Sequence, residues 1–358
     1  MASTQKIRRT QVNKVSRKAI AGVAMAAASL LVLSGCAAKP GAGFIECGVS
    51  DEGSWADKSF NESVMDGMEK AADEFGVTLN SAESNSSEDF APNLDAMVAA
   101  KCDVIFAVGF NLVDAVNAAA EANPEVNFVT IDGWSNGATN LKPVGYNMAE
   151  SSYLAGYAAA YYSTSKVVSV YGGLQIGAVT AFMDGFYYGA KAYETETGTP
   201  VTVLGWDATT QKGDFIGGFA PNAPEGKTIA AGHLAAGADV LVPVGGDQFG
   251  ALSEAISESG VDAKMIGVDK NISVTSPEYA PLTLTSIEKR MGSAVYDIVK
   301  ALAVDKEAFA GGMDNAYTGT LANGGTDISE TEFLDEALKT KLAELKAGII
   351  DGSVNPLG

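Results

Sequence analysis

Short apolar runs alternate with stretches of helical periodicity from Phe44 onward, and this alternation restricts the fold more than any other feature. In the first half the apolar runs cover residues 44–49, 77–80, 104–108 and 127–131. We expect these runs to be strands. The stretches between them, about 59–76, 87–98 and 112–122, place apolar residues on one face of a helix. A β-α-β order of this kind predicts a parallel sheet covered by helices on both faces.

The helix after the first strand has the clearest boundaries. Ser59 and Glu62 have the spacing of an S-x-x-E capping box, in which each side chain bonds the backbone near the other residue. Gly76 stands where a glycine commonly ends a helix. We therefore expect the Ser59 hydroxyl to cap this helix.

The same rhythm resumes in the second half, after a helix near residues 152–162. Strands are expected at 166–171, 201–204, 239–242 and 264–268, and helices at about 181–195, 224–236 and 248–259. Residues 281–287 and a helix at 288–304 suggest a return crossing, and 329–347 supply a last helix. The chain is therefore predicted to be an α/β protein with two doubly wound parallel-sheet lobes joined by a hinge. Lobe 1 would comprise 44–150 plus about 281–304, and lobe 2 would comprise 151–280 plus about 305–358.

The N-terminal segment has the pattern of an export signal. Six basic residues and no acid occur in the first 18 positions, an apolar run covers 19–33, and the run ends at Leu33-Ser34-Gly35-Cys36. This ending resembles a bacterial lipobox, so residues 1–35 are predicted to be a lipoprotein signal peptide and Cys36 the lipidated residue. Residues 36–43 would be a flexible tether, and the protein would be exported and anchored to the cell membrane by lipid.

Two further cysteines, Cys47 and Cys102, lie in or directly before predicted strands. An exported protein permits a disulfide between them but does not require one. Two separate buried thiols are the expectation from the sequence, with the disulfide as the open alternative.

The charge balance argues against several classes of function. Lys and Arg total 24 against 44 Asp and Glu, a formal net charge of −20, and without the six basic residues of the leader it becomes −26. Such a chain repels nucleic-acid backbones, so no nucleic-acid partner is expected. His233 is the only histidine, so the chain has no histidine pair for a metal site, and any Ser-His-Asp triad would have to use it. We expect no cofactor, no metal and no enzymatic activity.

Ligand-binding chemistry is expected in the loops after the strands, because ligands of open parallel sheets sit at the carboxyl ends of the strands. The first such loop contains Trp55, Asp57, Ser59, Phe60 and Asn61. Aromatic rings stack on flat ligands, while amides, hydroxyls and acids bind polar edges. The plainer alternative for Phe60 is a hydrophobic staple of the following helix.

Several other loops place polar or flexible residues at the same predicted edge. Asp269 ends an apolar strand, where a carboxylate can accept two hydrogen bonds from vicinal hydroxyls, and Lys289 follows twenty residues later. The two residues could equally be a salt bridge between the lobes or ordinary surface charges. Further candidates, each with an alternative role in a turn or cap, are Gly109, Phe110, Asp132, Gly245 and Gly246.

These motifs together resemble a known family. Asp57-Lys58-Ser59-Phe60-Asn61, Gly267-Val268-Asp269 and Thr285-Ser286-Ile287-Glu288-Lys289-Arg290 occur in the order seen in the basic membrane protein family of ABC-transporter substrate-binding lipoproteins. The resemblance covers the chain from about Phe44 to Ala347, and characterised family members include purine-nucleoside receptors. It implies a type I periplasmic-binding-protein fold that closes on one nucleoside and delivers it to a permease and an ATPase encoded elsewhere.

The resemblance also implies residue roles. Trp55 or Phe60 would stack on the base opposite Phe182 or Phe219, and Asn61 and Asp132 would contact the base edge. Asp269 and Lys289 would hold the ribose, with Gly245 and Gly246 near the sugar. The chain departs from the family pattern where Trp55-Ala56 replaces the usual phenylalanine and asparagine.

Four functions remain open on the sequence alone. The first is a nucleoside-binding lipoprotein of an ABC importer. The second keeps the fold but binds a sugar, a quorum signal or a flavin-like compound. The third is a surface-anchored enzyme acting on nucleosides, and the fourth is a sensor without transport.

Overall fold

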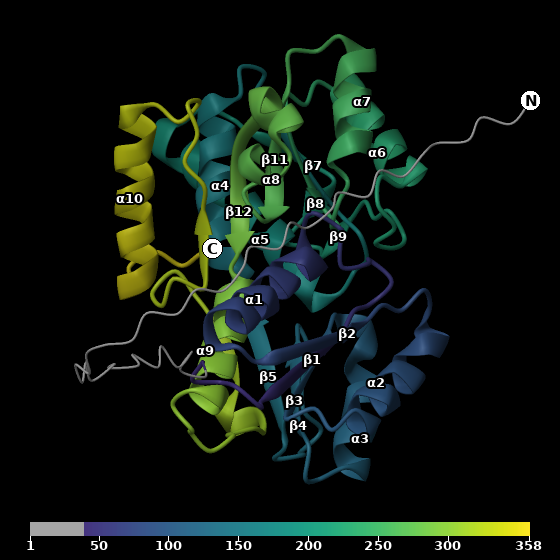
Figure 1. Cartoon of the computed structure of the whole chain (residues 1–358). Helices are drawn as coiled ribbons and strands as arrows, with labels where there is room; N and C mark the ends of the chain where they lie inside the picture. The colour runs from purple at the N-terminus through teal and green to yellow at the C-terminus, as the bar shows by residue number, and fades with distance from the viewer. Residues whose placement is uncertain (1–38) are drawn as a thin grey trace, which may run out of the picture. The chain divides into compact units, whose positions relative to one another are not determined.

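The computed structural model of the protein describes residues 39–358. Within this range the chain builds two six-stranded sheets and a two-stranded hairpin. We call the sheets with their helices lobe 1 and lobe 2, which lie in the lower and upper halves of Figure 1. The predicted signal peptide at 1–35, the predicted lipidation site at Cys36 and residues 37–38 lie outside the described residues. No helix between residues 39 and 358 is both long and apolar enough to cross a membrane.

Lobe 1 has the strand order β13-β5-β4-β3-β1-β2, and its paired neighbours are all parallel. Helices α1 and α9 cover one face of the sheet, and α2 and α3 cover the other. This arrangement confirms the parallel sheet with helices on both faces that the alternating pattern predicts. Its elements are β1 (Ile45–Val49), α1 (Phe60–Phe75), β2 (Thr78–Ala82), α2 (Phe90–Ala99), β3 (Val104–Val108), α3 (Val113–Ala122), β4 (Asn127–Ile131), β5 (Leu141–Tyr146), α9 (Met291–Ala303) and β13 (Tyr317–Gly319).

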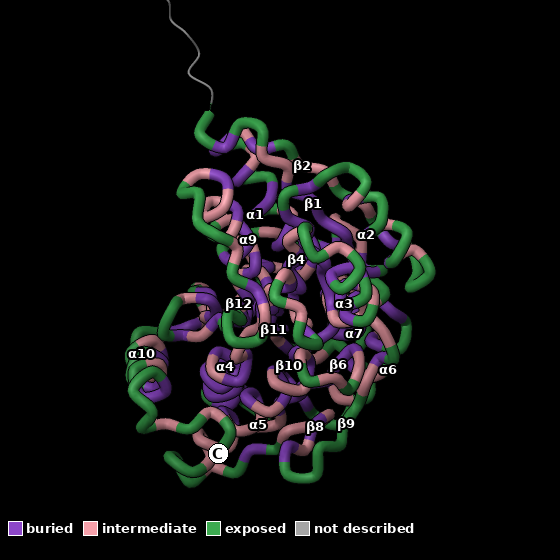
Figure 2. Tube along the Cα trace, turned by 90° about the horizontal axis from the view of Figure 1, so that it is seen from below, coloured by how far each residue is buried: buried purple, intermediate pink, exposed green. Residues whose placement is uncertain are grey.

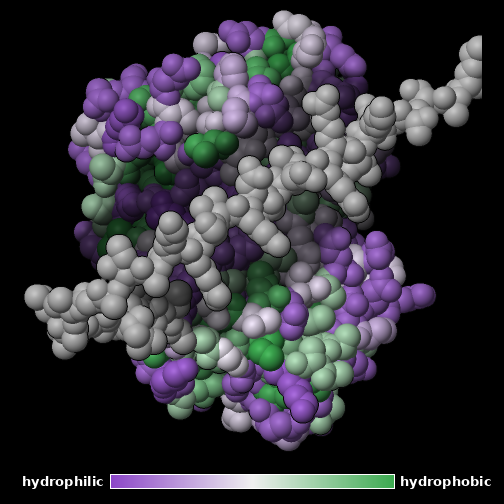
Figure 3. All heavy atoms as spheres, viewed as in Figure 1, coloured by the Kyte–Doolittle hydropathy of each residue, from purple (hydrophilic) through white to green (hydrophobic). Residues whose placement is uncertain are grey.

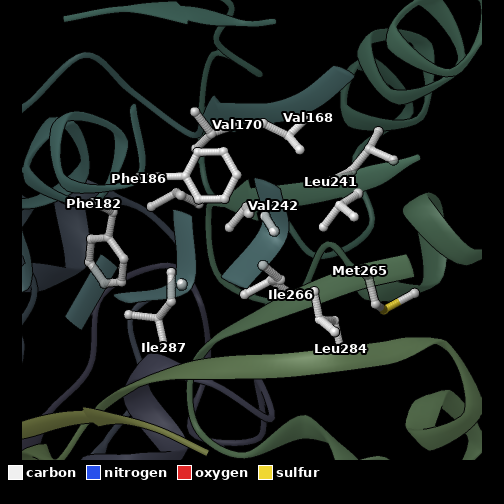
Figure 4. Close-up of a cluster of buried hydrophobic side chains, with 14 of the residues drawn as sticks. Val168, Val170, Phe182, Phe186, Leu241, Val242, Met265, Ile266, Leu284 and Ile287 are labelled. Atoms are coloured by element: carbon white, nitrogen blue, oxygen red, sulfur yellow. The ribbon is translucent and has the colours of Figure 1, made fainter. Parts of the chain in front are cut away.

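Lobe 2 has the corresponding order β14-β12-β11-β10-β6-β7, in which only β14 runs antiparallel to its neighbour. Figure 4 shows aliphatic side chains of β6, β10, β11 and β12 packed with two phenylalanines of α5. The elements are α4 (Met148–Tyr162), β6 (Val167–Gly172), α5 (Gly177–Thr197), β7 (Thr202–Leu204), β8 (Trp206–Asp207), β9 (Lys212–Gly213), α6 (Pro224–Ala235), β10 (Val240–Val244), α7 (Phe249–Ser259), β11 (Lys264–Asp269), α8 (Ile272–Thr275), β12 (Thr283–Lys289), β14 (Thr326–Ile328) and α10 (Glu336–Asp351).

Helices α4 and α5 pack unusually closely in lobe 2. A methyl group added at Gly156, Gly185 or Gly189 would overlap backbone atoms of the opposite helix. The small residues of α4 let the backbones approach, and most of α4 is buried, as its purple tube in Figure 2 shows. The outer surfaces are more polar, and hydrophilic residues cover much of the face of both lobes seen in Figure 3.

The chain crosses between the lobes after β5, after β12 and between β13 and β14, and this corrects the expected lobe boundaries. Residues 281–304 were expected in lobe 1, but β12 pairs with β11 in the lobe 2 sheet and only the following α9 packs in lobe 1. Residues 305–358 were expected in lobe 2, but β13 pairs with β5 in lobe 1. Strands as short as β13 and β14 have too few residues for a periodic signal, and their sheet membership depends on distant partners.

Cys47 and Cys102 form a disulfide, with Cα atoms 5.9 Å apart. The expectation of two separate thiols was therefore wrong. Cys47 lies in β1, and Cys102 lies two residues before the neighbouring parallel strand β3. Sheet pairing thus brings together two residues separated by 55 positions in the sequence.

The expected flexible tether is also partly wrong. Gly41 is buried, and its N–H donates to the Phe75 carbonyl at the end of α1, 2.8 Å away. A side chain at Gly41 would meet Val77 and Phe75. Residues 39–43 therefore form a turn that packs on lobe 1.

Candidate functional site

A cavity lies between the carboxyl ends of strands from both lobes. Lobe 1 contributes the residues after β1, β3 and β4, and lobe 2 contributes those at the ends of β10, β11 and β12. This is the edge where the loops of parallel sheets bind ligands. The lining residues are Asp51, Gly53, Asp57, Phe60, Asn61, Gly109, Phe110, Asn111, Asp132, Ile176, Ala178, Val179, Phe182, Phe219, Val244, Gly245, Gly246, Asp247, Val268, Asp269 and Lys289.

Asp57 organises the lobe 1 wall. Its carboxylate accepts hydrogen bonds from the backbone N–H groups of Ser59, Asn61 and Glu62, at 2.9, 2.9 and 3.1 Å. Asp57 therefore accepts the hydrogen bonds of the unpaired backbone N–H groups at the start of α1, a role expected of the Ser59 hydroxyl. Ser59 makes no side-chain capping bond. Burial raises the pKa of Asp57 even though these donors act in the opposite direction.

Asn61 and Asp51 form a second buried unit on this wall. The Asn61 amide nitrogen donates to Asp51 Oδ1 at 2.8 Å and to Asp57 Oδ2 at 3.1 Å. Asp51 Oδ1 also accepts from the Gly53 N–H at 2.9 Å. Burial raises the pKa of Asp51 to about 6, although its hydrogen bonds to Gly53 and Asn61 act to lower it.

Asp269 stands at the end of β11 and is almost fully buried. The Ser59 hydroxyl donates to Asp269 Oδ2 at 2.7 Å, so this bond joins the two lobes. Burial raises the pKa of Asp269 to about 6, although the Lys289 charge and the Ser59 hydrogen bond act to lower it. Asp269 and Asp132 both have left-handed backbone, with φ of 65° and 59°. A left-handed backbone is strained in residues other than glycine, and such residues are often found at binding sites.

Lys289 is the cationic side chain that lines the cavity. Its ammonium forms an ion pair with Asp132 and lies 5.1, 5.5 and 5.7 Å from the ring centres of Phe60, Tyr146 and Phe182. Lys289 itself is 2% exposed. Aromatic faces and a carboxylate together stabilise an ammonium that has lost most of its water.

Twelve of the fourteen ligand-binding residues expected from the sequence line this cavity, and Trp55 and Ser59 do not. The Trp55 ring packs on the lobe 1 core, over the space that Gly48 leaves beside Met68. Of the two residues expected to supply the lobe 1 stacking ring, the structure therefore places Phe60 in the cavity lining and Trp55 outside it. Ser59 lies behind the cavity wall, where it holds Asp269. Phe182 and Phe219, the two candidates for the second aromatic, both line the cavity.

Sequence reasoning missed three polar side chains of the cavity, Asp51, Asn111 and Asp247. Each lies two or three residues after the end of a strand, and that position could have identified them. Tyr146 was missed as well, because it contacts Lys289 from behind rather than lining the cavity. No group of three or more His, Cys, Asp or Glu residues in the range 39–358 is arranged to hold a metal ion.

The only histidine lies away from the cavity. His233 Nδ1 is 2.7 Å from Ser169 Oγ, and its Nε2 is 3.0 Å from Asp214 Oδ2. His233 thus lies between a serine and an aspartate, as the histidine of a hydrolytic triad does. Ser169, however, is fully buried within β6. A nucleophile must reach its substrate, so this group is structural.

Comparison with known proteins agrees with this geometry. The family model described as ABC transporter substrate-binding protein PnrA-like matches residues 44–354. The chain belongs to this family. It is 30% identical over 364 residues to a Lactococcus lactis subsp. cremoris protein named ABC transporter nucleoside-binding protein BmpA, and the match covers 95% of this chain and 99% of that protein.

Solved structures give the same fold. An ABC transporter solute-binding protein from Aeropyrum pernix K1 superposes with a TM-score of 0.75 at 25% identity, over 87% of this chain and 92% of that one. A second, from Conexibacter woesei DSM 14684, has a TM-score of 0.64 at 17% identity, over 87% and 98%. The predicted type I periplasmic-binding-protein fold is confirmed.

Membership of the PnrA-like family confirms three expectations at a general level. This PnrA-like protein is a substrate-binding protein of the ABC-transporter class and not an enzyme. Its partners are a small-molecule ligand and a transporter. Proteins of this class act outside the cytoplasm, as expected for an exported chain.

Proposed function

We propose that this PnrA-like protein is a lipid-anchored receptor that binds a nucleoside, with a purine as the preferred base, between its two lobes. The anchor would be Cys36, and the receptor would deliver its ligand to a permease and an ATPase encoded elsewhere. The observation that carries the proposal is the cavity itself, which combines aromatic rings from both lobes with Asp269 and Lys289.

The aromatic residues suit a flat base. Phe60 and Phe110 come from lobe 1, and Phe182 and Phe219 come from lobe 2. A base held between rings from both lobes gains its full stacking energy, about 1–3 kcal/mol per stacked base, only when the lobes are together. Stacking would thus couple ligand binding to closure of the lobes.

The polar residues of lobe 2 suit a sugar. Asp269 offers carboxylate oxygens to vicinal hydroxyls, as acidic residues do for a ribose in other open α/β proteins. Lys289 can donate to the same hydroxyls, and Gly245 and Gly246 leave space for close approach of the sugar to the backbone.

The charge of the cavity favours a nucleoside over a nucleotide. Five aspartates line it, against Lys289 as the cationic side chain, and Lys289 is already paired with Asp132. A phosphate would face carboxylates without a compensating basic cluster. The ligand is therefore expected to be uncharged.

Calorimetric titration tests the proposal. The purified protein would be titrated with purine and pyrimidine nucleosides, free bases, ribose, nucleoside 5′-phosphates and riboflavin, and the titrations repeated with Asp269→Asn. Asp262→Asn is the matched control, because Asp262 is exposed just before the opposite end of β11. We expect purine nucleosides to bind best and Asp269→Asn alone to weaken them at least about tenfold, as loss of a charged hydrogen-bond acceptor predicts.

Other results would contradict specific parts. Binding of ribose or riboflavin but not of nucleosides would support the receptor function and contradict the proposed ligand. Binding of nothing at millimolar ligand would contradict the proposed function as a whole.

A further inference from the structure

We propose that the lobe 1 wall selects a base whose hydrogen-bonding edge carries two adjacent donors, so that guanosine binds more tightly than inosine and inosine more tightly than adenosine. This inference rests on the nucleoside function proposed above. It adds which hydrogen-bond donors the preferred base must carry. It is carried by the fixed orientation of Asn61 and by the free oxygen of Asp51.

The Asn61 amide is held in one orientation. Its nitrogen donates to both Asp51 and Asp57, so both amide hydrogens are used. A flipped amide would place its oxygen against two carboxylates, which is electrostatically unfavourable. Asn61 Oδ1 is buried, and among the described residues it has no hydrogen-bond partner. Asn61 is one of the residues that line the cavity, so we infer that a donor on a bound ligand would satisfy this oxygen.

Asp51 supplies a second acceptor beside it. Its Oδ1 is occupied by the Gly53 N–H and by Asn61, but Oδ2 accepts no hydrogen bond from residues 39–358. That oxygen lies directly against Gly109, where a side chain would overlap it. Glycine at position 109 therefore lets the backbone pass close to the carboxylate, where any side chain would collide with it.

The two nearest side-chain donors of the cavity already have protein acceptors. Asn111 lines the same wall, and its amide nitrogen donates to Glu52 at 3.1 Å. The Lys289 ammonium is paired with Asp132. Asn61 Oδ1 and Asp51 Oδ2 are therefore two oxygen acceptors of this wall that have no donor from residues 39–358.

Purine edges differ in how well they meet such a wall. Guanine carries adjacent donors at N1–H and at its exocyclic amine, and hypoxanthine carries only N1–H. Adenine carries a donor amine beside an N1 lone pair, which would face a carboxylate or amide oxygen. A buried polar site discriminates strongly against a ligand that leaves its groups unpaired. We therefore expect guanosine to bind at least about tenfold more tightly than adenosine.

The test compares the three nucleosides on the wild type and on Asp51→Asn. Asparagine has nearly the same shape, and its oxygen can still accept from Asn61, but its amide adds a donor to the wall. We expect guanosine to lose about tenfold in affinity, and the ratio of the guanosine to the adenosine affinity to fall to one or below. Asp114→Asn, an exposed change on α3, is the control and should leave the ratio unchanged.

A direct measurement covers the case in which Asp51→Asn folds poorly. Guanosine labelled with ¹⁵N, bound to the wild type, should show a protected N1–H proton shifted downfield by its bond to an oxygen acceptor. Equal affinity for adenosine and guanosine, an unchanged ratio in Asp51→Asn, or an N1–H that exchanges freely would overturn this inference and leave the nucleoside receptor intact. Failure of every nucleoside to bind would overturn the proposed function, and this inference with it.

Discussion

The two lobes have corresponding strand orders, but Asp239 of lobe 2 and Glu46 of lobe 1 are buried in opposite ways. In lobe 2, Asp239 accepts hydrogen bonds from the N–H groups of Thr164 and Ser165 and from the hydroxyls of Ser163 and Thr164. In lobe 1, Glu46 lies fully buried in β1, and within residues 39–358 neither of its oxygens has a hydrogen-bond partner. Lobe 1 in turn carries the disulfide between Cys47 and Cys102.

This comparison shows how surroundings decide the charge of a buried acid. Burial alone acts to raise the pKa of Asp239, but its hydrogen bonds outweigh burial and lower it, so this carboxylate is ionised at neutral pH. Burial without partners raises the pKa of Glu46 to about 8, so this carboxyl is protonated at neutral pH. Ionised Asp239 therefore stabilises lobe 2. Glu46 lowers the stability of lobe 1 when its carboxyl loses its proton.

The largest expected effect is on the covalent link of lobe 1. Replacing both Cys47 and Cys102 with alanine removes a loop closure over 55 positions, which should lower the free energy of unfolding by about 2–4 kcal/mol. Urea unfolding of the double variant, with reduced wild type beside it, measures this. An effect within about 0.5 kcal/mol, the range of ordinary surface substitutions, would show that lobe 1 does not depend on the link.

The next effect tests the hydrogen-bonded acid of lobe 2. Asp239→Ala leaves four donors without their acceptor and should cost about 2–3 kcal/mol at pH 7. Because the folded-state pKa is lowered, the wild-type advantage should be lost as the pH falls through that pKa. Asp262→Ala is the exposed control. Equal stability of the two variants would contradict the role assigned to Asp239.

The buried acid of lobe 1 should respond in the opposite direction. The folded pKa of Glu46, about 8, exceeds its ordinary value of 4.5, so its folded form keeps a proton that the unfolded chain loses. Stability should therefore fall as the pH rises from 4.5 to 8 because of this group.

Glu46→Met removes the ionisable group and should raise the free energy of unfolding by about 1–2 kcal/mol at pH 8, with a smaller gain at pH 5. Thermal unfolding at both pH values measures this. Equal destabilisation of the variant at both pH values would contradict the assignment of Glu46 as a buried acid without hydrogen-bond partners.

The smallest effect concerns contacts between the lobes. Lys270, which follows β11 of lobe 2, forms ion pairs of 2.7 Å with Glu62 and Asp66, one turn apart on α1 of lobe 1. Lys270→Met should favour the open form and weaken ligand binding about threefold to fivefold without touching the cavity wall. Lys58→Met is the matched control, because the Lys58 pair with Glu278 is longer, at 3.5 Å, and more exposed. Equal loss in both variants would argue against a specific role for Lys270.

The sequence determined the order of strands and helices and the loops that carry the site. Strands such as β3 and β4 were predicted to the residue because a buried parallel strand is a continuous apolar run between polar ends. The cavity residues Asp269, Gly245 and Gly246 followed from the same pattern, since the carboxyl ends of parallel strands meet at one edge.

Only the tertiary structure decided which partners those residues have. Ser59 was expected to cap its own helix but bonds Asp269, 210 residues away. Trp55 was expected to face a ligand, but its ring packs over Gly48. Strand β12 was expected in lobe 1 and lies in lobe 2, and the segment that contains β13 was expected in lobe 2 but β13 lies in lobe 1. Periodicity and capping motifs report on neighbours along the chain, whereas these contacts join residues that only folding brings together.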